Sequence, residues 1–267
     1  MSEKKKHHRG RRKKKKGNLI INIVLLLAIV VFFVSGVMLV RSLLPYIQAK
    51  DEYDKIKDLA IETKNDEEPE GTEEDAPGFS VDFASLLEIN PDTVGWIRFD
   101  EPSIISYPIV QGSDNSEYLH RTFQANDNHL GAIFMAAESK ADFTNRNTLI
   151  YGHNVKIGGE MFSQLKSYQD EDFYRQYPYF YIYTPDGKAK TYQIFSAGVV
   201  KEDADNYITS YASDEDYVNY LNMAKNSSLY DTGVALNAQS MIVSLSTCTN
   251  VREDERFLVQ GVLIKEE

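Results

Sequence analysis

The feature that most constrains this chain is an uncharged, largely apolar run from Leu19 to Val40, 22 residues long. As a helix rising about 1.5 Å per residue, the run can cross a bilayer hydrocarbon core of about 30 Å. It exceeds the roughly 7–15 apolar residues of a cleaved signal peptide, and the following Arg41-Ser-Leu-Leu-Pro-Tyr contains no small-x-small cleavage site. The sequence therefore predicts a retained transmembrane anchor at residues 19–40.

The charges around this run predict its orientation. Ten of the 29 lysines and arginines precede Gly17, in a basic tail over residues 1–18 that leads directly into the apolar run. Short basic flanks stay on the cytoplasmic side of a membrane. We therefore expect a single-pass protein of the cell membrane with a cytoplasmic N-terminus, an extracellular main part and the lipid bilayer as a partner. Nucleic-acid binding by the tail is the less favoured alternative, because the apolar run adjoins it.

Beyond the tail the chain is acidic, with 19 basic and 39 acidic residues. This balance argues against nucleic acid or anionic lipid as a partner of the exported part, and it is compatible with a cationic or amine-bearing partner. The chain has one cysteine, Cys248, which cannot form an internal disulfide. That thiol either pairs between chains or is kept free for its reactivity. About 190 exported residues are enough to bury a core without disulfides.

Composition divides the exported part into a stalk and a folded domain. Residues 41–78 begin with helix-compatible sequence and continue, from Lys64 to Gly78, as an acidic stretch with almost no apolar residue. Such a stretch buries too little surface to offset its ordering entropy. We predict a helical and acidic stalk over 41–78 and a folded domain over 79–267. The domain should open with a short helix at 80–90 that has Ser80 as its N-cap and ends at Asn90-Pro91.

After Pro91 the pattern changes to short β-type runs between turn residues. Eight such runs predict a mainly β fold, a closed or nearly closed barrel or a sandwich. The runs span residues 93–99, 104–111, 132–135, 148–151, 179–184, 191–200, 241–247 and 257–264. Two helical segments are expected between them, at 160–168 and at 213–224, the second capped by Ser213 with Asp216 in a capping-box-like position.

Cys248 ends the apolar run 241–247, and Arg256 follows eight positions later. A guanidinium close to the thiol would stabilise a thiolate or an oxyanion, so this arrangement is typical of a cysteine nucleophile. A buried structural cysteine is the alternative for a lone cysteine considered by itself. Arg252 competes with Arg256, but it lies in a charged loop instead of at the start of a strand.

A cysteine nucleophile usually needs a histidine, and the chain has five. His7 and His8 lie in the cytoplasmic tail, and His120 and His129 lie in polar surroundings typical of surface residues. His153 follows the buried-type strand that starts at Asn147. Its imidazole is therefore held at the end of a rigid strand, as the thiol of Cys248 is held at the end of the run 241–247. Asp142 and Asn154 are near His153 in the chain, which is the only reason to consider them as its orienting partners.

The sequence predicts no metal and no cofactor. Zinc usually requires clustered Cys and His ligands, whereas this domain has one cysteine and three scattered histidines. The acidic loops at 203–205 and 214–216 lack the regular oxygen-ligand spacing of a calcium loop.

Taken together, these residues resemble the sortases, and among them class B. The family motif T-L-x-T-C is matched by Ser244-Leu-Ser-Thr-Cys248, with Ser in place of the first Thr. The family's histidine follows a strand as His153 does, and its arginine, on the next strand after the cysteine, corresponds to Arg256. The resemblance covers about residues 79–264. It implies an eight-stranded sortase-type β-barrel with an N-terminal helical segment and a helix between strands six and seven.

The resemblance also implies a function, that of a membrane-anchored cysteine transpeptidase of Gram-positive bacteria. Such an enzyme cleaves a C-terminal sorting signal of exported proteins through a thioacyl intermediate and transfers them to a peptidoglycan amine. Cys248 would be the nucleophile, His153 the general acid and base, and Arg256 the stabiliser of oxyanion and substrate. Ser246 and Thr247 would contribute to substrate binding.

Two other functions stay open from the sequence: a membrane-tethered cysteine peptidase, which has the same thiol and imidazole, and a non-catalytic surface or pilus-assembly module with a structural Cys248. The sorting motif also stays open, since class B signals range from N-P-Q-T-N-like to P-P-x-T-G-like. Residues that select the motif are expected between Ser196 and Thr232.

Overall fold

The structure is a computed structural model that describes residues 10–63, 79–155 and 158–267. The chain divides after Ile47 into two compact units. Helix α1 (Gly10–Ala60) runs through this boundary. Its part from Leu19 onward contains a stretch with a mean hydropathy of 3.2 and no buried residue, long and apolar enough to cross a membrane. The predicted tail up to residue 9 and the acidic stalk at 64–78 lie outside the described residues.

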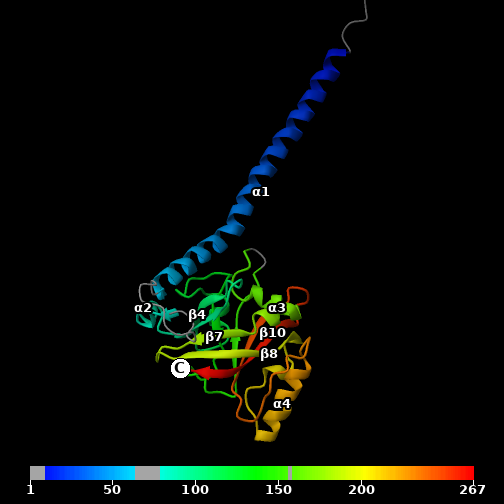
Figure 1. Ribbon diagram of the computed structural model, residues 1–267. Coiled ribbons are helices and arrows are strands. Elements are labelled where there is room, and N and C mark those ends of the chain that lie inside the picture. Colours follow the sequence, from blue (N-terminus) through cyan, green and yellow to red (C-terminus); the bar gives the residue numbers. More distant parts are fainter. Residues whose placement is uncertain (1–9, 64–78, 156–157) are drawn as a thin grey trace, which may run out of the picture. The chain divides into compact units, whose positions relative to one another are not determined.

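The unit from Gln48 onward contains a closed eight-stranded barrel, so the predicted mainly β fold is confirmed and the barrel is favoured over the sandwich. Around the barrel the order is β10-β8-β7-β3-β4-β5-β6-β9, and β9 closes onto β10. The long strands β8 and β10 lie side by side in Figure 1. The strands are β3 (Thr93–Phe99), β4 (Ser106–Val110), β5 (Ile133–Met135), β6 (Asn147–Tyr151), β7 (Tyr179–Tyr183), β8 (Ala189–Lys201), β9 (Ile242–Cys248) and β10 (Glu255–Glu266).

The directions of β6, β9 and β10 bring the ends of two strands and the start of a third to the same edge of the barrel. Strand β6 pairs with β9 in parallel, so both strands end at the same edge. Strand β10 pairs with β9 in antiparallel orientation and therefore begins at that edge. Side chains at two strand ends and one strand start thus become neighbours, although they are far apart in the sequence.

A buried polar network joins these three strands to helix α4 (Asp214–Asn226). Gln260 on β10 donates to the hydroxyl of Ser244 on β9 over 2.9 Å and to the hydroxyl of Tyr220 on α4 over 3.0 Å. The hydroxyl of Ser244 in turn donates to the Asn147 side chain on β6 over 2.8 Å. Because buried polar groups are costly unless they are paired, this network favours a single arrangement of the three strands.

Helix α4 confirms the prediction at 213–224. The Ser213 side chain accepts a hydrogen bond from the Asp216 backbone N–H, as an N-cap does. The apolar face of the helix packs against β8, β9 and β10 in one core cluster, whose buried members are Phe195, Tyr217, Tyr220, Leu221, Ala224, Val234, Ile242 and Val262.

The helix expected at 80–90 forms, but it is shorter and has a different cap. Helix α2 spans Phe83–Ile89, and its N-cap is Asp82, which accepts from the Ser85 backbone N–H. Ser80, the predicted cap, lies in strand β2 (Phe79–Val81), which pairs with β1 (Ile61–Thr63). The prediction of Ser80 was wrong because a strand pairing with a distant segment takes up this residue. The predicted end at Asn90 is confirmed.

The segment expected to be helical at 160–168 is a 3-10 helix, η2 (Ser163–Gln169), and a short helix α3 (Glu171–Gln176) follows it. Asp170 caps α3 by accepting from the Asp172 backbone N–H. Two single-turn 3-10 helices, η1 (Glu117–Leu119) and η3 (Asp205–Tyr207), lie in the long connections after β4 and after β8.

The last turns of α1 belong to the same compact unit as the barrel. Ala49, Tyr53, Ile56 and Ala60 are nearly fully buried, at the i, i+3, i+4 spacing of one helix face. The unit that carries the barrel thus begins close behind the apolar stretch of α1.

Candidate active site

The strand register brings the three predicted catalytic residues to one barrel edge. Cys248, the last residue of β9, lies directly opposite Arg256 near the start of β10. Opposed residues of an antiparallel pair have their side chains on the same face, with Cβ atoms about 4.5–5.5 Å apart. On the other side of β9, Tyr151 lies beside Ser246 in the parallel register, so His153 follows next to Cys248.

Cys248 has a free, half-buried thiol, and hydrogen bonds hold the backbone at this end of β9. The Asn154 side-chain amide donates to the Cys248 carbonyl over 2.7 Å. In return, the Asn250 side-chain amide donates to the Asn154 carbonyl over 2.8 Å. The residues after β6 and after β9 therefore hold each other, and this reciprocal pair of bonds fixes the backbone that carries the imidazole relative to the backbone that carries the thiol.

The His153 ring is oriented by a backbone carbonyl. Its Nε2 lies 2.7 Å from the Leu119 carbonyl oxygen. A carbonyl oxygen only accepts, so Nε2 carries a proton and Nδ1 is the nitrogen left for proton transfer. Asn154 donates to Cys248 instead, and Asp142 binds the backbone and hydroxyl of Thr144 in an exposed loop. Neither of the two neighbours in sequence orients the imidazole.

The surroundings of His153 shift the pKa of its imidazole downward. Burial lowers the pKa of its imidazole, the bond to Leu119 opposes this, and His120 and His129 lower the pKa further. The ring of His120 lies 6.5 Å from that of His153, between centroids. His120 and His129 are exposed, as the sequence predicts.

We expect His153 to titrate below the ordinary histidine value of about 6.5. Between that value and the lowered pKa, the unfolded chain binds a proton that the folded chain lacks, so acidification through this window reduces the free energy of unfolding. An NMR titration of the histidine resonances, with His153→Gln for assignment, measures the midpoint. A midpoint at or above 6.5 contradicts this prediction.

Arg256 is partly engaged by its own surroundings. Its Nη1 donates to the backbone carbonyls of Glu253 at 2.6 Å and Glu255 at 3.1 Å, and its Nη2 pairs with the Glu202 carboxylate. A guanidinium has five N–H groups, so Nε and one hydrogen of Nη2 have no partner among the described residues. The competing Arg252 has a side chain that is 68% exposed, against 24% for Arg256, and pairs with Glu255.

Two tyrosines that sequence reasoning missed lie beside Ser246, two residues before the thiol on β9. Tyr207 forms a 2.8 Å hydrogen bond with the hydroxyl of Ser246, and its ring stacks on Tyr151 with centroids 6.5 Å apart. Ser246 and Cys248 share one face of β9, because strand side chains alternate. Thr247 points to the other face, where its hydroxyl is buried and has no partner among the described residues. The stacked pair comes from β6 and η3, which no local sequence pattern connects.

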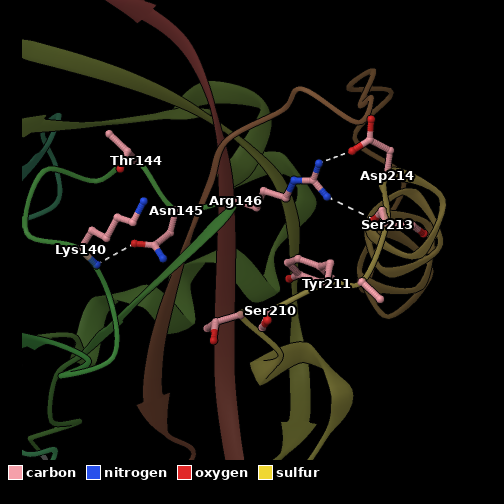
Figure 2. A pocket seen from close by; sticks show the side chains of 10 residues that line it. Lys140, Thr144, Asn145, Arg146, Ser210, Tyr211, Ser213 and Asp214 are labelled. Carbon is pink, nitrogen blue, oxygen red and sulfur yellow. Dashed lines mark hydrogen bonds and ion pairs between the residues drawn. The ribbon is translucent and has the colours of Figure 1, made fainter.

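A polar hollow of about 420 Å³ lies at the opposite end of β6, away from His153. Figure 2 shows Arg146 there, reaching across to the Ser213 carbonyl and to Asp214. Five strand residues, at about 3.3 Å each, separate this hollow from the thiol edge. The hollow is therefore distinct from the candidate active site.

In the described part of the chain, no group of three or more His, Cys, Asp or Glu residues is arranged to hold a metal ion.

A thiol, an imidazole and a guanidinium thus lie at one barrel edge, and these are the groups that cysteine-dependent acyl transfer requires. Residues 100–264 match the model of the sortase domain family. The chain therefore belongs to the sortase family, whose members are cysteine transpeptidases.

The relatives place the chain in class B. It is 32% identical to sortase B of Listeria monocytogenes over 187 residues, which cover 68% of this chain and 74% of that protein. The solved complex of Staphylococcus aureus sortase B with substrate matches with a TM-score of 0.64 and 31% identity over 68% of this chain and 84% of that one. A sortase B complexed with triglycine matches with a TM-score of 0.63 and 33% identity over 68% and 85%.

Proposed function

We propose that this class B sortase cleaves a C-terminal sorting signal of exported proteins and joins them, through a thioacyl intermediate, to a peptidoglycan amine. The observation that carries the proposal is the register of β6, β9 and β10, which places His153 and Arg256 on either side of Cys248. A thiol between a proton donor and a fixed cation has the groups required to split an amide and to hold its acyl part.

The chemistry follows from these three side chains. Nδ1 of His153 takes the proton of the Cys248 thiol, and the resulting thiolate attacks the carbonyl carbon of a threonine in the signal. The former carbonyl oxygen becomes an oxyanion. The free N–H groups of Arg256 stabilise that oxyanion. Nδ1 of the His153 imidazolium gives its proton to the leaving nitrogen, so the C–N bond breaks and a thioester remains. An incoming amine then attacks the thioester, loses its proton to the imidazole and releases the thiolate.

Protein substrate and amine acceptor are supported by the relatives solved with a substrate and with triglycine. The excess of acidic residues outside the tail is compatible with an amine-bearing partner. The apolar stretch of α1 is a candidate membrane anchor, and the basic tail before it supports an extracellular catalytic domain. We propose Ser246, through its bond to Tyr207, as the better placed of the two predicted substrate contacts, because Thr247 faces away from the thiol.

Arg256→Ala is expected to reduce kcat/KM about 100-fold, because the variant loses a charged donor to the oxyanion. Steady-state rates with a signal peptide and an amine measure the effect. Arg252→Ala is the matched control, since this exposed arginine also pairs with an acidic neighbour, and it should have almost wild-type activity. Equal losses in both variants would contradict the role of Arg256.

The function is tested with the full chain in detergent micelles, a panel of N-P-Q-T-N-like and P-P-x-T-G-like peptides, and triglycine as the amine. Mass spectrometry should detect the amide product between peptide and triglycine, and a thioester adduct on the protein when triglycine is omitted. Free acid at the same rate with and without the amine would instead identify a membrane-tethered peptidase. No reaction with any peptide, together with a thiol that resists alkylation, would favour a non-catalytic module.

A further inference from the structure

The last turns of α1 contact both segments that hold His153 in place. We call residues 48–60 the juxtamembrane segment, because they follow the apolar stretch of the same helix. One of the two segments is the 118–131 loop, which supplies the acceptor for the imidazole. The other is the 160–162 turn, which bonds to the His153 backbone.

Tyr53 of the juxtamembrane segment is bonded to the 118–131 loop at two points. Its hydroxyl donates to the Gly131 carbonyl over 2.8 Å and accepts from the Phe123 backbone N–H over 3.1 Å. The side chain is 2% exposed, so its hydroxyl bonds are made away from water. Next to it, the Glu52 carboxylate accepts from the Gln124 backbone N–H and from the Thr122 hydroxyl, both over 2.9 Å.

Gly131 of this loop lies next to the imidazole of His153. A Cβ atom on Gly131 would lie 2.8 Å from the Leu119 carbonyl oxygen and 2.9 Å from Cδ2 of His153. The glycine therefore fits closely between the carbonyl that orients the ring and the ring itself. Its φ of 60° is in the left-handed region, which glycine adopts without strain. The carbonyl bonded by Tyr53 belongs to this same residue, so Tyr53 holds the residue that lies against both the His153 ring and the carbonyl that orients it.

The 160–162 turn is held by a second set of contacts. Lys50 forms a 2.9 Å salt bridge with Glu160, whose other oxygen accepts from the buried Tyr107 hydroxyl over 2.6 Å. Phe162, two residues further, donates its backbone N–H to the His153 carbonyl over 3.0 Å. The juxtamembrane segment thus contacts, through Tyr53, the loop that contains the acceptor of the imidazole, and, through Lys50, the turn that bonds to the His153 backbone.

We propose that Tyr53 is a positioning residue for catalysis: from the juxtamembrane segment it holds Gly131, and through it the Leu119 carbonyl, so that Nδ1 of His153 is aimed at the leaving nitrogen. This inference rests on the role proposed above for His153. It assigns part of the catalytic geometry to a segment outside the barrel. Because the three residues of the site lie on the barrel, the sequence motifs contain no sign of this contribution.

The test compares Tyr53→Phe with Tyr217→Phe in the full chain in detergent micelles. Tyr217 is a matched control, since its buried hydroxyl also bonds backbone oxygens, those of Arg146 and Ser240, but at the other end of β6. We expect kcat to fall about 10-fold in Tyr53→Phe with KM within about twofold, because the acid is misplaced while substrate binding is kept. Tyr217→Phe should keep both constants within about twofold of wild type.

Equal kcat in the two variants overturns the inference, and so does a loss that appears in KM alone. If Tyr53→Phe does not fold, as judged by circular dichroism, Glu52→Ala replaces it. That variant loosens the same loop from a partly exposed position and should lower kcat in the same way. Wild type and His153→Gln are measured in parallel. A wild-type chain that forms no amide product refutes the proposed function, and a fully active His153→Gln enzyme refutes the role of His153 on which the inference rests. An impaired His153→Gln enzyme with an unaffected Tyr53→Phe enzyme refutes the positioning role alone.

Discussion

A chain carrying Cys248→Ala is expected to keep its fold and to lose transpeptidation by about 10⁴-fold or more. Without the sulfur no thioester can form, and the remaining groups act only through binding and oxyanion stabilisation. The fold should be kept because Cys248 is half-buried at a strand end, where its carbonyl, and not its side chain, makes the bond to Asn154. The rate of amide formation between a signal peptide and triglycine measures the loss.

The single cysteine makes this experiment easy to control. Alkylation should add one label to the wild-type chain and none to the variant, and the labelled wild type should be as inactive as Cys248→Ala. Circular dichroism and thermal unfolding show whether the variant is folded. Full activity of Cys248→Ala would exclude thiol catalysis and revive the structural interpretation of this residue.

His153→Gln is expected to reduce kcat/KM about 10³-fold, within the range for loss of a general acid. Glutamine is an informative replacement because its amide N–H can still donate to the Leu119 carbonyl, as Nε2 does, yet it transfers no proton at neutral pH. The loss should therefore be mainly in kcat. Single-turnover measurement of thioester formation separates this step from the later attack by the amine.

His120→Gln is the matched control for this prediction. Its ring stacks against that of His153, but it is exposed and lies in the loop instead of at a barrel strand end. Near neutral pH we expect little change in kcat/KM. A large loss in His120→Gln with little loss in His153→Gln would reverse the assignment of the general acid.

The strands were predictable from the sequence because each is defined by a local pattern. Alternating or continuous apolar runs between turn residues identify all eight, and the Ser213 cap identifies α4 in the same way. The Ser80 cap failed because strand pairing between β1 and β2 is a long-range event. The closed order of the barrel could not be predicted either, because it depends on long-range pairing. Strands β6 and β9 pair across about ninety residues of chain, and no local sequence pattern predicts such a pairing.

The candidate site likewise contains residues that the sequence predicts and partners that it does not. Cys248, His153 and Arg256 could be chosen from the sequence, because each lies at the start or end of a β-type run and has a distinctive side chain. Their partners could not: Leu119 acts through its backbone carbonyl, which any residue has. Glu202 is one of many acidic residues in this chain, and only the pairing of β8 with β10 brings it to Arg256. Tyr207 likewise meets Ser246 only in the folded chain.

The paired amide bonds of Asn154 and Asn250 have a mechanical consequence. They link the segment after β6 to the segment after β9 in both directions, so neither can shift without stretching a bond to the other. A displacement of this edge of the barrel would therefore move the backbones of Cys248 and His153 together, which favours a constant separation between them. Arg256 is not part of this link, because its side chain bonds instead to Glu253 and Glu255, around the start of β10, and to Glu202, which directly follows β8.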